Sequence, residues 1–407
     1  MGALPPLRVS RSYGGPIPAD PYPSHHAGVE ASRLRCAGHT GIRGPREVAH
    51  WPGHGGTNFA PGEISGWHGG AARPIFAHNK TEEVFPLKHF TLVSATALAL
   101  SVAAPAAAQM QLSIATGGTG GVYYPMGGGL AEIINNHIDG YSATAEVTGA
   151  SVENMGLVAS GDADLAIGLA DTVYQAQTGT GRFEGQQLEM IRGIASLYAN
   201  MVQIVALDGS GITSLSDLRG RRVSVGAPGS GTEVNAQQIL NANGITYDDI
   251  DEQRLNFNET ADALANGDID AGFWSVGAPT SSILNLATTQ SIHMIALTPE
   301  EMTAAIGANP IFARTSLPGG IYNGVDQPVP VVGVPNVLVV SSAMDDDLAY
   351  QITRAMFENI DELRAVHPAA NQTTVEFTLD ATPVPLHPGA IRYFEEIGAT
   401  VPDRLRP

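Results

Sequence analysis

The segment ATGGTGGVYYPMGGG, residues 115–129, places seven glycines in fifteen positions ahead of a predicted helix. Glycine lets a backbone approach a ligand closely and point its N–H groups toward it. The first N–H groups of a helix have no partner within the helix and lie at the positive end of its dipole, so this loop is suited to binding an anion. Thr119 and Tyr123 add hydroxyl donors. For this loop taken alone, a tight strand-to-helix turn is the alternative interpretation.

A second loop of the same kind, Gly229-Ser230-Gly231-Thr232, lies further along the chain. It follows a short predicted strand, residues 222–225, and precedes a predicted helix, residues 232–242. Two matched loops favour ligand binding over two unrelated turns, because both can present helix N-termini to one anion.

Neither glycine loop fits a nucleotide-binding pattern. A dinucleotide fingerprint that starts at Gly118 would need glycine at position 123, where Tyr123 stands. A phosphate-binding P-loop needs a lysine, and residues 109–407 contain none. The sequence therefore argues against a nucleotide as the ligand.

Residues 109–407 lack the sequence signatures of catalysis and of metal binding. Zinc-protease, serine-hydrolase-elbow and C-x-x-C motifs do not occur in them. The four histidines, at positions 137, 293, 367 and 387, fit no metal-ligand spacing. We expect no catalytic residue, no metal and no cofactor. Arg192 is a candidate counter-charge for an anion, with a surface salt bridge as its alternative role.

The elements that must position the two loops alternate between strands and helices, which predicts an α/β fold. In the first half a strand (112–116) precedes the glycine loop and a helix (124–138) follows it. A second helix begins at Ser151 as its N-cap, with Asn154 in its first turn. The second half repeats this order, including a Gly-Asp-x-Asp turn in each half. We expect two similar lobes with a ligand cleft between them.

Chain length and the predicted return of the chain set the lobe boundaries. About 300 residues exceed what one core comfortably supports. A late strand run followed by a long predicted helix, residues 344–366, indicates that the chain crosses back to the first lobe. We predict that lobe I comprises residues 109–208 and 330–407, and that lobe II comprises residues 209–329.

The segment before residue 109 has the pattern of a secretory signal peptide. A basic pair at 88–89 precedes an apolar run at 90–102, and small residues place cleavage after Ala108. We therefore predict a signal peptide at residues 84–108 and export to the periplasm. Residues 1–83 are rich in glycine, proline and histidine, which predicts a disordered or wrongly assigned extension.

The charge of the predicted mature chain excludes some partners. Residues 109–407 carry 12 basic and 34 acidic side chains, so their formal charge is 12 − 34 = −22. Nucleic acids and anionic membrane surfaces bind basic patches. We expect neither as a partner.

Four ordered motifs make the sequence similar to the TAXI family, the TRAP-associated extracytoplasmic immunogenic proteins. They are IATGGTGGVYYPMGGGLAE, GASVENMGLVASGDADLAIGLAD, VSVGAPGSGTEVNA and DAGFWSVGAP, and the resemblance covers residues 111 to about 395. Members of this family are solute receptors of tripartite ATP-independent periplasmic (TRAP) transporters. The resemblance implies a two-lobed periplasmic-binding-protein fold of type II. It also implies closure on a small carboxylate, of the glutamate or 2-oxoglutarate kind.

The resemblance further implies which residues contact the ligand. Carried onto this sequence, they are Gly118, Thr119, Gly120, Gly121, Tyr123, Ser151, Asn154, Ser230, Gly231, Thr232, Phe273, Trp274 and Gly277. The implied partner is a TRAP membrane permease, driven by an ion gradient. Two other functions stay open at this point: a ligand-sensing module for a membrane kinase, and an exported α/β enzyme that uses the same cleft.

Overall fold

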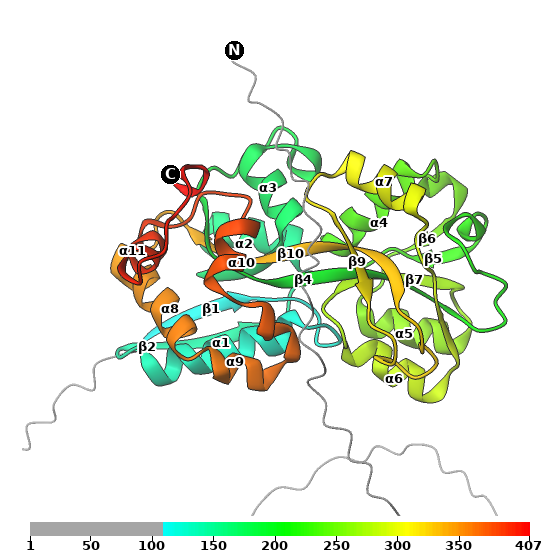
Figure 1. The fold of residues 1–407 in the computed structure, drawn as a ribbon, viewed down its shortest axis with the longest axis horizontal. Helices are drawn as coiled ribbons and strands as arrows, with labels where there is room; N and C mark the ends of the chain where they lie inside the picture. Colours follow the sequence, from blue (N-terminus) through cyan, green and yellow to red (C-terminus); the bar gives the residue numbers. More distant parts are fainter. Residues whose placement is uncertain (1–108) are drawn as a thin grey trace, which may run out of the picture. The chain divides into compact units, whose positions relative to one another are not determined.

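The structure, a computed structural model, describes residues 109–407, which belong to one compact unit of the chain (Figure 1). The predicted signal peptide and the predicted N-terminal extension lie outside the described residues. Among residues 109–407, no helix is both long enough and apolar enough to cross a membrane.

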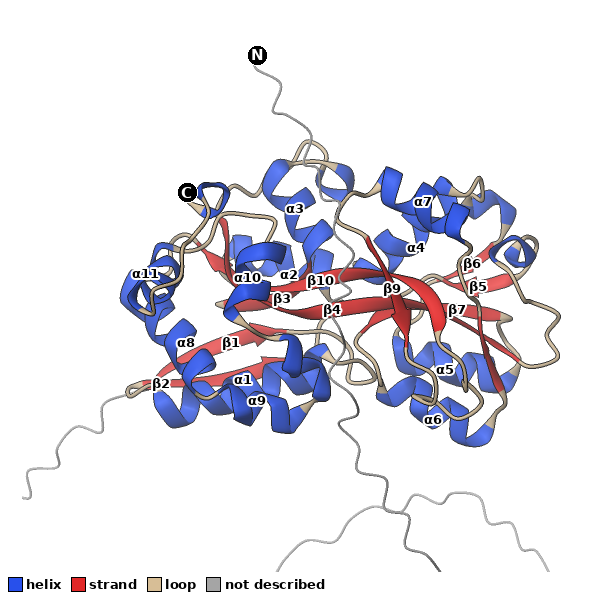
Figure 2. Cartoon of the chain, in the orientation of Figure 1, coloured by secondary structure: helices blue, strands red, loops and turns tan. Residues whose placement is uncertain are grey.

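The strands of the described chain form one mixed sheet (Figure 2). They are β1 (Met110–Ala115), β2 (Tyr141–Glu146), β3 (Leu165–Leu169), β4 (Ile191–Leu207), β5 (Arg222–Ser224), β6 (Asp251–Gln253), β7 (Ala271–Val276), β8 (Ile292–Met294), β9 (Ala313–Leu317) and β10 (Val329–Ser341). The strand order is β2-β1-β3-β10-β4-β7-β5-β6, while β8 also pairs with β4 and β9 with β10.

Helices cover both ends of this sheet (Figure 1). They are α1 (Tyr123–His137), α2 (Ser151–Ser160), α3 (Ala170–Thr178), α4 (Gly231–Ala242), α5 (Phe257–Asn266), α6 (Ser281–Thr289), α7 (Pro299–Ala308), α8 (Asp346–Glu358), α9 (Ile360–Val366), α10 (Val375–Ala381) and α11 (Pro388–Glu396). Helices α4 to α7 lie around one end, and α1, α8, α9 and α11 lie around the other.

The two ends of the sheet have the same topology. At one end β2, β1 and β3 run parallel in that order, and β10 pairs antiparallel with β3. At the other end β6, β5 and β7 run parallel in that order, and β4 pairs antiparallel with β7. The two glycine loops follow β1 and β5, the middle strands of the two trios. This topology confirms the predicted α/β periplasmic-binding-protein fold, whereas the predicted lobe boundaries stay a prediction.

The long strands β4 and β10 connect the two ends of the sheet (Figure 2). They pair antiparallel with each other from Met201 back to Ile191 in β4. From Met201 onward, β4 pairs with β7 instead. Both strands therefore hydrogen-bond to elements of both predicted lobes, which makes them the covalent and hydrogen-bonded link across the pocket described below.

The predicted helix 344–366 is two helices in the structure, so this prediction was wrong. Asn359 separates α8 from α9 with a backbone outside the helical region, and its Nδ2 donates to the carbonyl of Ala355 at 2.8 Å. Asparagine competes in this way with the helical backbone for hydrogen bonds, which explains the break.

Candidate ligand-binding pocket

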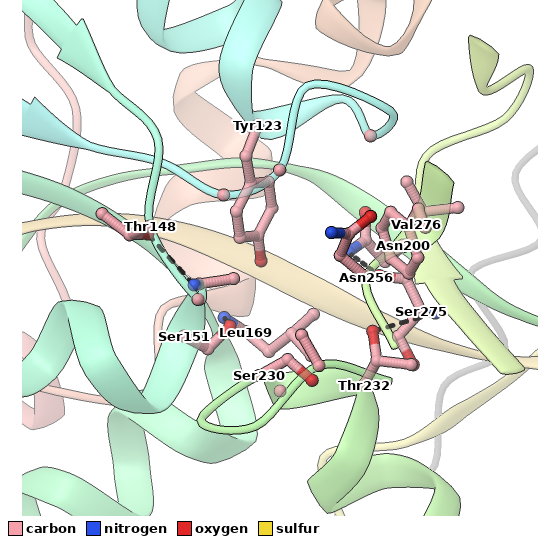
Figure 3. Close-up of a pocket in the computed structure, with 18 of the residues that line it drawn as sticks. Tyr123, Thr148, Ser151, Leu169, Asn200, Ser230, Thr232, Asn256, Ser275 and Val276 are labelled. Atoms are coloured by element: carbon pink, nitrogen blue, oxygen red, sulfur yellow. Dashed lines mark hydrogen bonds between the residues drawn. The ribbon is translucent and has the colours of Figure 1, made fainter. Parts of the chain in front are cut away.

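A pocket opens where the starts of four helices, α1, α2, α4 and α5, meet the ends of strands β3 and β7 (Figure 3). It contains about 540 Å³ of empty space, its open mouth included. Its lining is Gly117, Gly118, Gly121, Val122, Tyr123, Thr148, Gly149, Ala150, Ser151, Leu169, Asn200, Ala227, Ser230, Gly231, Thr232, Asn256, Phe257, Ser275 and Val276. All of these side chains are neutral.

The first glycine loop reaches the pocket with only part of its length. Gly118 and Gly121 line it, whereas Thr119 and Gly120 face the start of α5 and α6. The Thr119 hydroxyl accepts from Asn258 Nδ2 at 3.3 Å, and the Gly120 carbonyl accepts from the Thr280 hydroxyl at 3.0 Å. The sequence cannot separate these two groups of residues, because the loop has a pocket side and a side that packs on helices far away in the chain.

The second glycine loop reaches the pocket with all three of its predicted contact residues, Ser230, Gly231 and Thr232. Ser230 is the N-cap of α4, and its Oγ accepts from the N–H of Glu233 at 3.1 Å. Glycine is required at 231, because a Cβ there would lie 2.5 Å from Cδ1 of Leu169 and 2.7 Å from Oγ of Ser151. The loop thus brings the start of α4 against the start of α2.

Two backbone N–H groups at the start of α2 already have hydrogen-bond partners within the protein. The N–H groups of Val152 and Glu153 both donate to the carbonyl of Gly229, at 3.0 and 3.2 Å. Ser151 lines the pocket, but it is the first residue of α2 and not its N-cap, which is Ala150. Its Oγ accepts instead from the N–H of Leu169 at 3.1 Å. An anion in the pocket therefore does not find the α2 amides free.

Asn154 does not line the pocket. It is fully buried, and its Nδ2 donates to the carbonyls of Thr116 at 2.7 Å and Ile167 at 2.8 Å. These bonds tie α2 to the segment after β1 and to β3. Asn154, predicted to contact the ligand, therefore supports the pocket from the core and does not line it.

The predicted aromatic wall also lies behind the pocket. Phe273 and Trp274 are fully buried and do not line it, because only the last residues of β7, Ser275 and Val276, reach its edge. Trp274 donates from Nε1 to the Ser282 hydroxyl at 3.1 Å. Its ring stacks on that of Phe257, with centroids 6.2 Å apart. Phe257 and Tyr123 are the aromatic residues of the pocket lining.

Gly277 allows a close approach of β7 to neighbouring side chains. A Cβ at this position would lie 3.0 Å from the ring of Tyr198 and 3.2 Å from Cγ2 of Val122. Gly277 is not part of the lining. Its small size lets Val122 of the lining and the buried Tyr198 pack against it.

A buried polar network under the pocket includes Tyr123, Asn200 and Asn336. The Tyr123 hydroxyl, which points into the centre of the pocket in Figure 3, donates to Asn336 Oδ1. Asn336 Nδ2 donates to Asn200 Oδ1 at 2.9 Å, and Asn200 Nδ2 donates to the Ser275 carbonyl at 2.8 Å. Burial raises the pKa of the Tyr123 phenol well above its usual value, so the phenol stays neutral.

Asn336 enters this network at an irregularity of β10. The register with β4 shifts between Pro335 and Val337. Proline has no N–H for the ladder, and such sites accept a bulge that re-aims a side chain. Asn336 is thereby buried among Tyr123 and Asn200.

Ser275 carries the one buried side-chain polar atom of the described lining that has no hydrogen-bond partner. Its side chain is 95% buried, being 5% exposed, and its Oγ has no hydrogen-bond partner within residues 109–407. Its N–H donates to Thr232 Oγ1 at 3.4 Å. A buried hydroxyl without a partner costs free energy, so a ligand atom at this position would be stabilised.

Asp171 is a buried carboxylate next to the pocket, outside its lining. Its Oδ2 accepts from Asn235 Nδ2 at 2.7 Å and from Asn309 Nδ2 at 3.0 Å. Its Oδ1 accepts from the N–H of Thr172 at 2.9 Å. Burial raises the pKa of Asp171 to about 6, although these hydrogen bonds favour the charged form. Asp171 is in α3, while Asn235 and Asn309 belong to the predicted lobe II.

Arg192 lies at the start of β4 and is not part of the pocket. Its guanidinium donates to the carbonyls of Glu189 at 2.6 Å and Ile191 at 2.9 Å. It is therefore no counter-charge for a ligand in this pocket. No group of three or more histidine, cysteine, aspartate or glutamate residues that could hold a metal was found among residues 109–407.

Sequence reasoning missed twelve of the nineteen lining residues, among them Asn200, Asn256, Phe257 and Ser275. Asn256 had a recognisable signal as an N-cap, with Glu259 three residues later, and its Oδ1 accepts from the N–H groups of 258 and 259. Asn200 and Ser275 are polar residues inside apolar strands. Only strand pairing brings them to the same edge of the pocket.

Comparisons with known proteins give one family and several distant structures. The model of the NMT1-like family matches residues 114–398. A solved structure from Bordetella bronchiseptica RB50 is 20% identical, covering 73% of this chain and 91% of that chain with a TM-score of 0.43. The periplasmic aliphatic sulphonate binding protein SsuA from Escherichia coli is 12% identical, covering 72% and 94% with a TM-score of 0.36. The alkanesulfonate-binding protein SsuA from Xanthomonas axonopodis pv. citri, bound to MOPS, is 16% identical, covering 72% and 95% with a TM-score of 0.37.

Proposed function

The chain belongs to the NMT1-like family, and we propose that it is an exported receptor that binds a small carboxylate for a membrane transporter. One observation carries this proposal: a pocket lined by helix starts and hydroxyl groups contains a buried serine hydroxyl, Ser275, without a partner. Helix N-termini attract anions, and a hydroxyl donor adds to that attraction.

The overall charge of −22 for residues 109–407 does not oppose this proposal. Surface charges are screened beyond about 8–10 Å at physiological salt. The donors of the pocket act at hydrogen-bond distance, where the field of the surface counts for little.

Binding without catalysis fits the composition of the described lining. The hydroxyls of Ser230, Thr232 and Ser275 have no histidine, lysine or carboxylate among the lining residues to act as a general base. Activated nucleophiles need such a base within hydrogen-bond reach. An exported enzyme is therefore not the function we propose.

We propose hinge closure as the mechanism of capture, with lobe I as residues 109–208 and 330–407 and lobe II as residues 209–329. Strands β4 and β10 pair with elements of both lobes and are the candidate hinge. A ligand that contacts Tyr123 on one side and Thr232 on the other would favour the closed state, because it makes both sets of contacts only there.

We propose a TRAP permease as the partner and the periplasm as the location. The support is the resemblance of four ordered motifs to the TAXI family, together with the signal-peptide pattern at residues 84–108. A reconstitution experiment distinguishes this role from sensing: uptake of the ligand into vesicles that contain a TRAP permease should depend on the receptor. Uptake that is independent of the receptor would contradict the transport role.

The binding proposal is tested by a thermal-shift screen against carboxylates, followed by calorimetry on the best ligand. A ligand at 100 times its Kd should raise the unfolding free energy by about 2.7 kcal/mol. Thr232→Val should weaken binding at least about tenfold, because it removes a hydroxyl donor to a charged ligand.

Thr119→Val is the matched control for Thr232→Val. It makes the same chemical change in the other glycine loop, at a threonine outside the lining. Equal losses of affinity in both variants, or no stabilising carboxylate at all, would contradict the assignment of this pocket.

A further inference from the structure

Three hydroxyl groups of the pocket can donate a hydrogen bond to a ligand. Ser230 Oγ already accepts from the Glu233 N–H, and Thr232 Oγ1 already accepts from the Ser275 N–H, which leaves both O–H groups able to donate. Ser275 Oγ is unpartnered. These three hydroxyls belong to the start of α4 and the adjoining end of β7.

Three side-chain acceptors of the same pocket already accept hydrogen bonds from the protein. Asn256 Oδ1 accepts from two backbone N–H groups at the start of α5. Asn200 Oδ1 accepts from Asn336 Nδ2 at 2.9 Å, and Thr148 Oγ1 accepts from the Ala150 N–H at 3.0 Å. An ammonium group on a ligand would need acceptors of this kind.

The carboxylates near the pocket are also committed. Asp171 accepts from Thr172, Asn235 and Asn309. Glu233 pairs with Arg254 at 3.3 Å and with Arg182 at 3.6 Å. Neither carboxylate is part of the lining. A positive charge buried in the pocket would therefore have no counter-charge in the described lining, which costs several kcal/mol.

The start of α4 offers a place for the negative end of a ligand. The α2 amides of Val152 and Glu153 are taken by the Gly229 carbonyl. The lining also contains apolar side chains, among them Val122, Phe257 and Val276.

We infer that the ligand is a carboxylate without a positive charge, a 2-oxo, 2-hydroxy or unsubstituted acid in preference to an amino acid, with its carboxylate held by Ser230, Thr232 and Ser275. This inference rests on the proposed binding function and narrows it. It separates the two ligand kinds that the sequence resemblance leaves together, because glutamate carries an ammonium group and 2-oxoglutarate does not.

The test compares ligands that share a carbon skeleton and differ only at C2. The pairs are 2-oxoglutarate with L-glutamate, 4-methyl-2-oxopentanoate with L-leucine, and pyruvate and lactate with L-alanine, measured by calorimetry on the full chain. In the pair that binds, we expect the oxo or hydroxy acid to bind at least about 100-fold more tightly than the amino acid, given the cost of an unpaired buried charge.

The outcomes of this comparison separate the inference about the ligand class from the proposed receptor function. An amino acid that binds as tightly as its oxo acid, or more tightly, overturns this inference and leaves the receptor function intact. If no acid of any pair binds, the inference and the proposed function both fail.

Ser275→Ala tests where the carboxylate lies. The variant should fold as the wild type does, since Ser275 Oγ has no partner in the protein. It should weaken binding of the acid about tenfold and binding of the corresponding primary amide by less, because a hydrogen bond to a charged acceptor is the stronger one. If both ligands lose affinity equally, or neither does, the carboxylate is not at Ser275 and this part of the inference is wrong.

Discussion

Asp171 makes the stability of this protein depend on pH in a way that one substitution should remove. Burial raises the pKa of this carboxyl from 3.8 to about 6. A carboxyl whose pKa is raised by folding binds more protons in the folded state between those two values. Its contribution to stability is therefore fully present below the unfolded pKa and is lost as the pH rises through 6.

The size of this contribution follows from the shift. A change from 3.8 to about 6 is 2.2 units, and at 1.36 kcal/mol per unit it amounts to about 3 kcal/mol. Part of the titration lies below pH 4. Between pH 7.5 and pH 4.0 the change should therefore be about 2–3 kcal/mol.

Asp171→Asn keeps the shape of the side chain and removes its titration. Urea unfolding of the wild type and the variant at pH 7.5 and pH 4.0 gives four free energies of unfolding. On acidification the wild type should gain about 2–3 kcal/mol relative to the variant. His367 and His387, whose pKa values are lowered by burial, act in the opposite direction but are present in both proteins and cancel.

Asp262→Asn is the control for the loss of one negative charge, because Asp262 is an exposed residue of α5. It should track the wild type at both pH values. A wild-type minus Asp171→Asn difference that changes by less than about 0.5 kcal/mol, or in the opposite direction, would refute the linkage worked out here.

Two further predictions concern a glycine of the pocket and the export of the chain. Gly231→Ala should lower the free energy of unfolding by about 1–3 kcal/mol and weaken binding, because its Cβ would meet Leu169 and Ser151 within 3.0 Å. Gly128→Ala in α1 is its control and should be neutral or stabilising by up to about 1 kcal/mol, since no atom lies within 4 Å of its Cβ. Urea unfolding measures both variants, and similar losses of stability in the two would contradict the argument. N-terminal sequencing of the exported protein should begin near Gln109, and a mature protein that retains residues 1–83 would contradict the predicted cleavage.

Much of the fold was predictable because its signals are local. A strand, a glycine loop and a helix follow one another at residues 110–137 and again at residues 222–242, as predicted. Glycine, N-cap residues and apolar periodicity act within a few residues, so the sequence carries them directly. The sequence could not show that Thr119 faces α5 and not the pocket, because its hydrogen-bond partner Asn258 is 139 positions away.

The pocket was predictable only in part, for a related reason. Seven of the thirteen predicted contacts line it, at positions 118, 121, 123, 151, 230, 231 and 232. The two aromatic residues predicted to line the pocket, Phe273 and Trp274, lie in the core. The next two residues of β7, Ser275 and Val276, line the pocket. Where a strand ends at a pocket depends on the register of its neighbours, which the strand's own residues do not state.

The sequence by itself determined which backbone devices this protein has: two glycine loops, each leading from a strand into a helix that can face an anion. Tertiary structure alone decided which hydrogen-bonding groups around these loops are free. The Gly229 carbonyl fills the start of α2, whereas the start of α4 keeps the hydroxyls of Ser230 and Thr232 beside the unpartnered Ser275. Hydrogen-bond partners are used up by residues that approach from other parts of the chain, and only the folded arrangement shows which groups remain for a ligand.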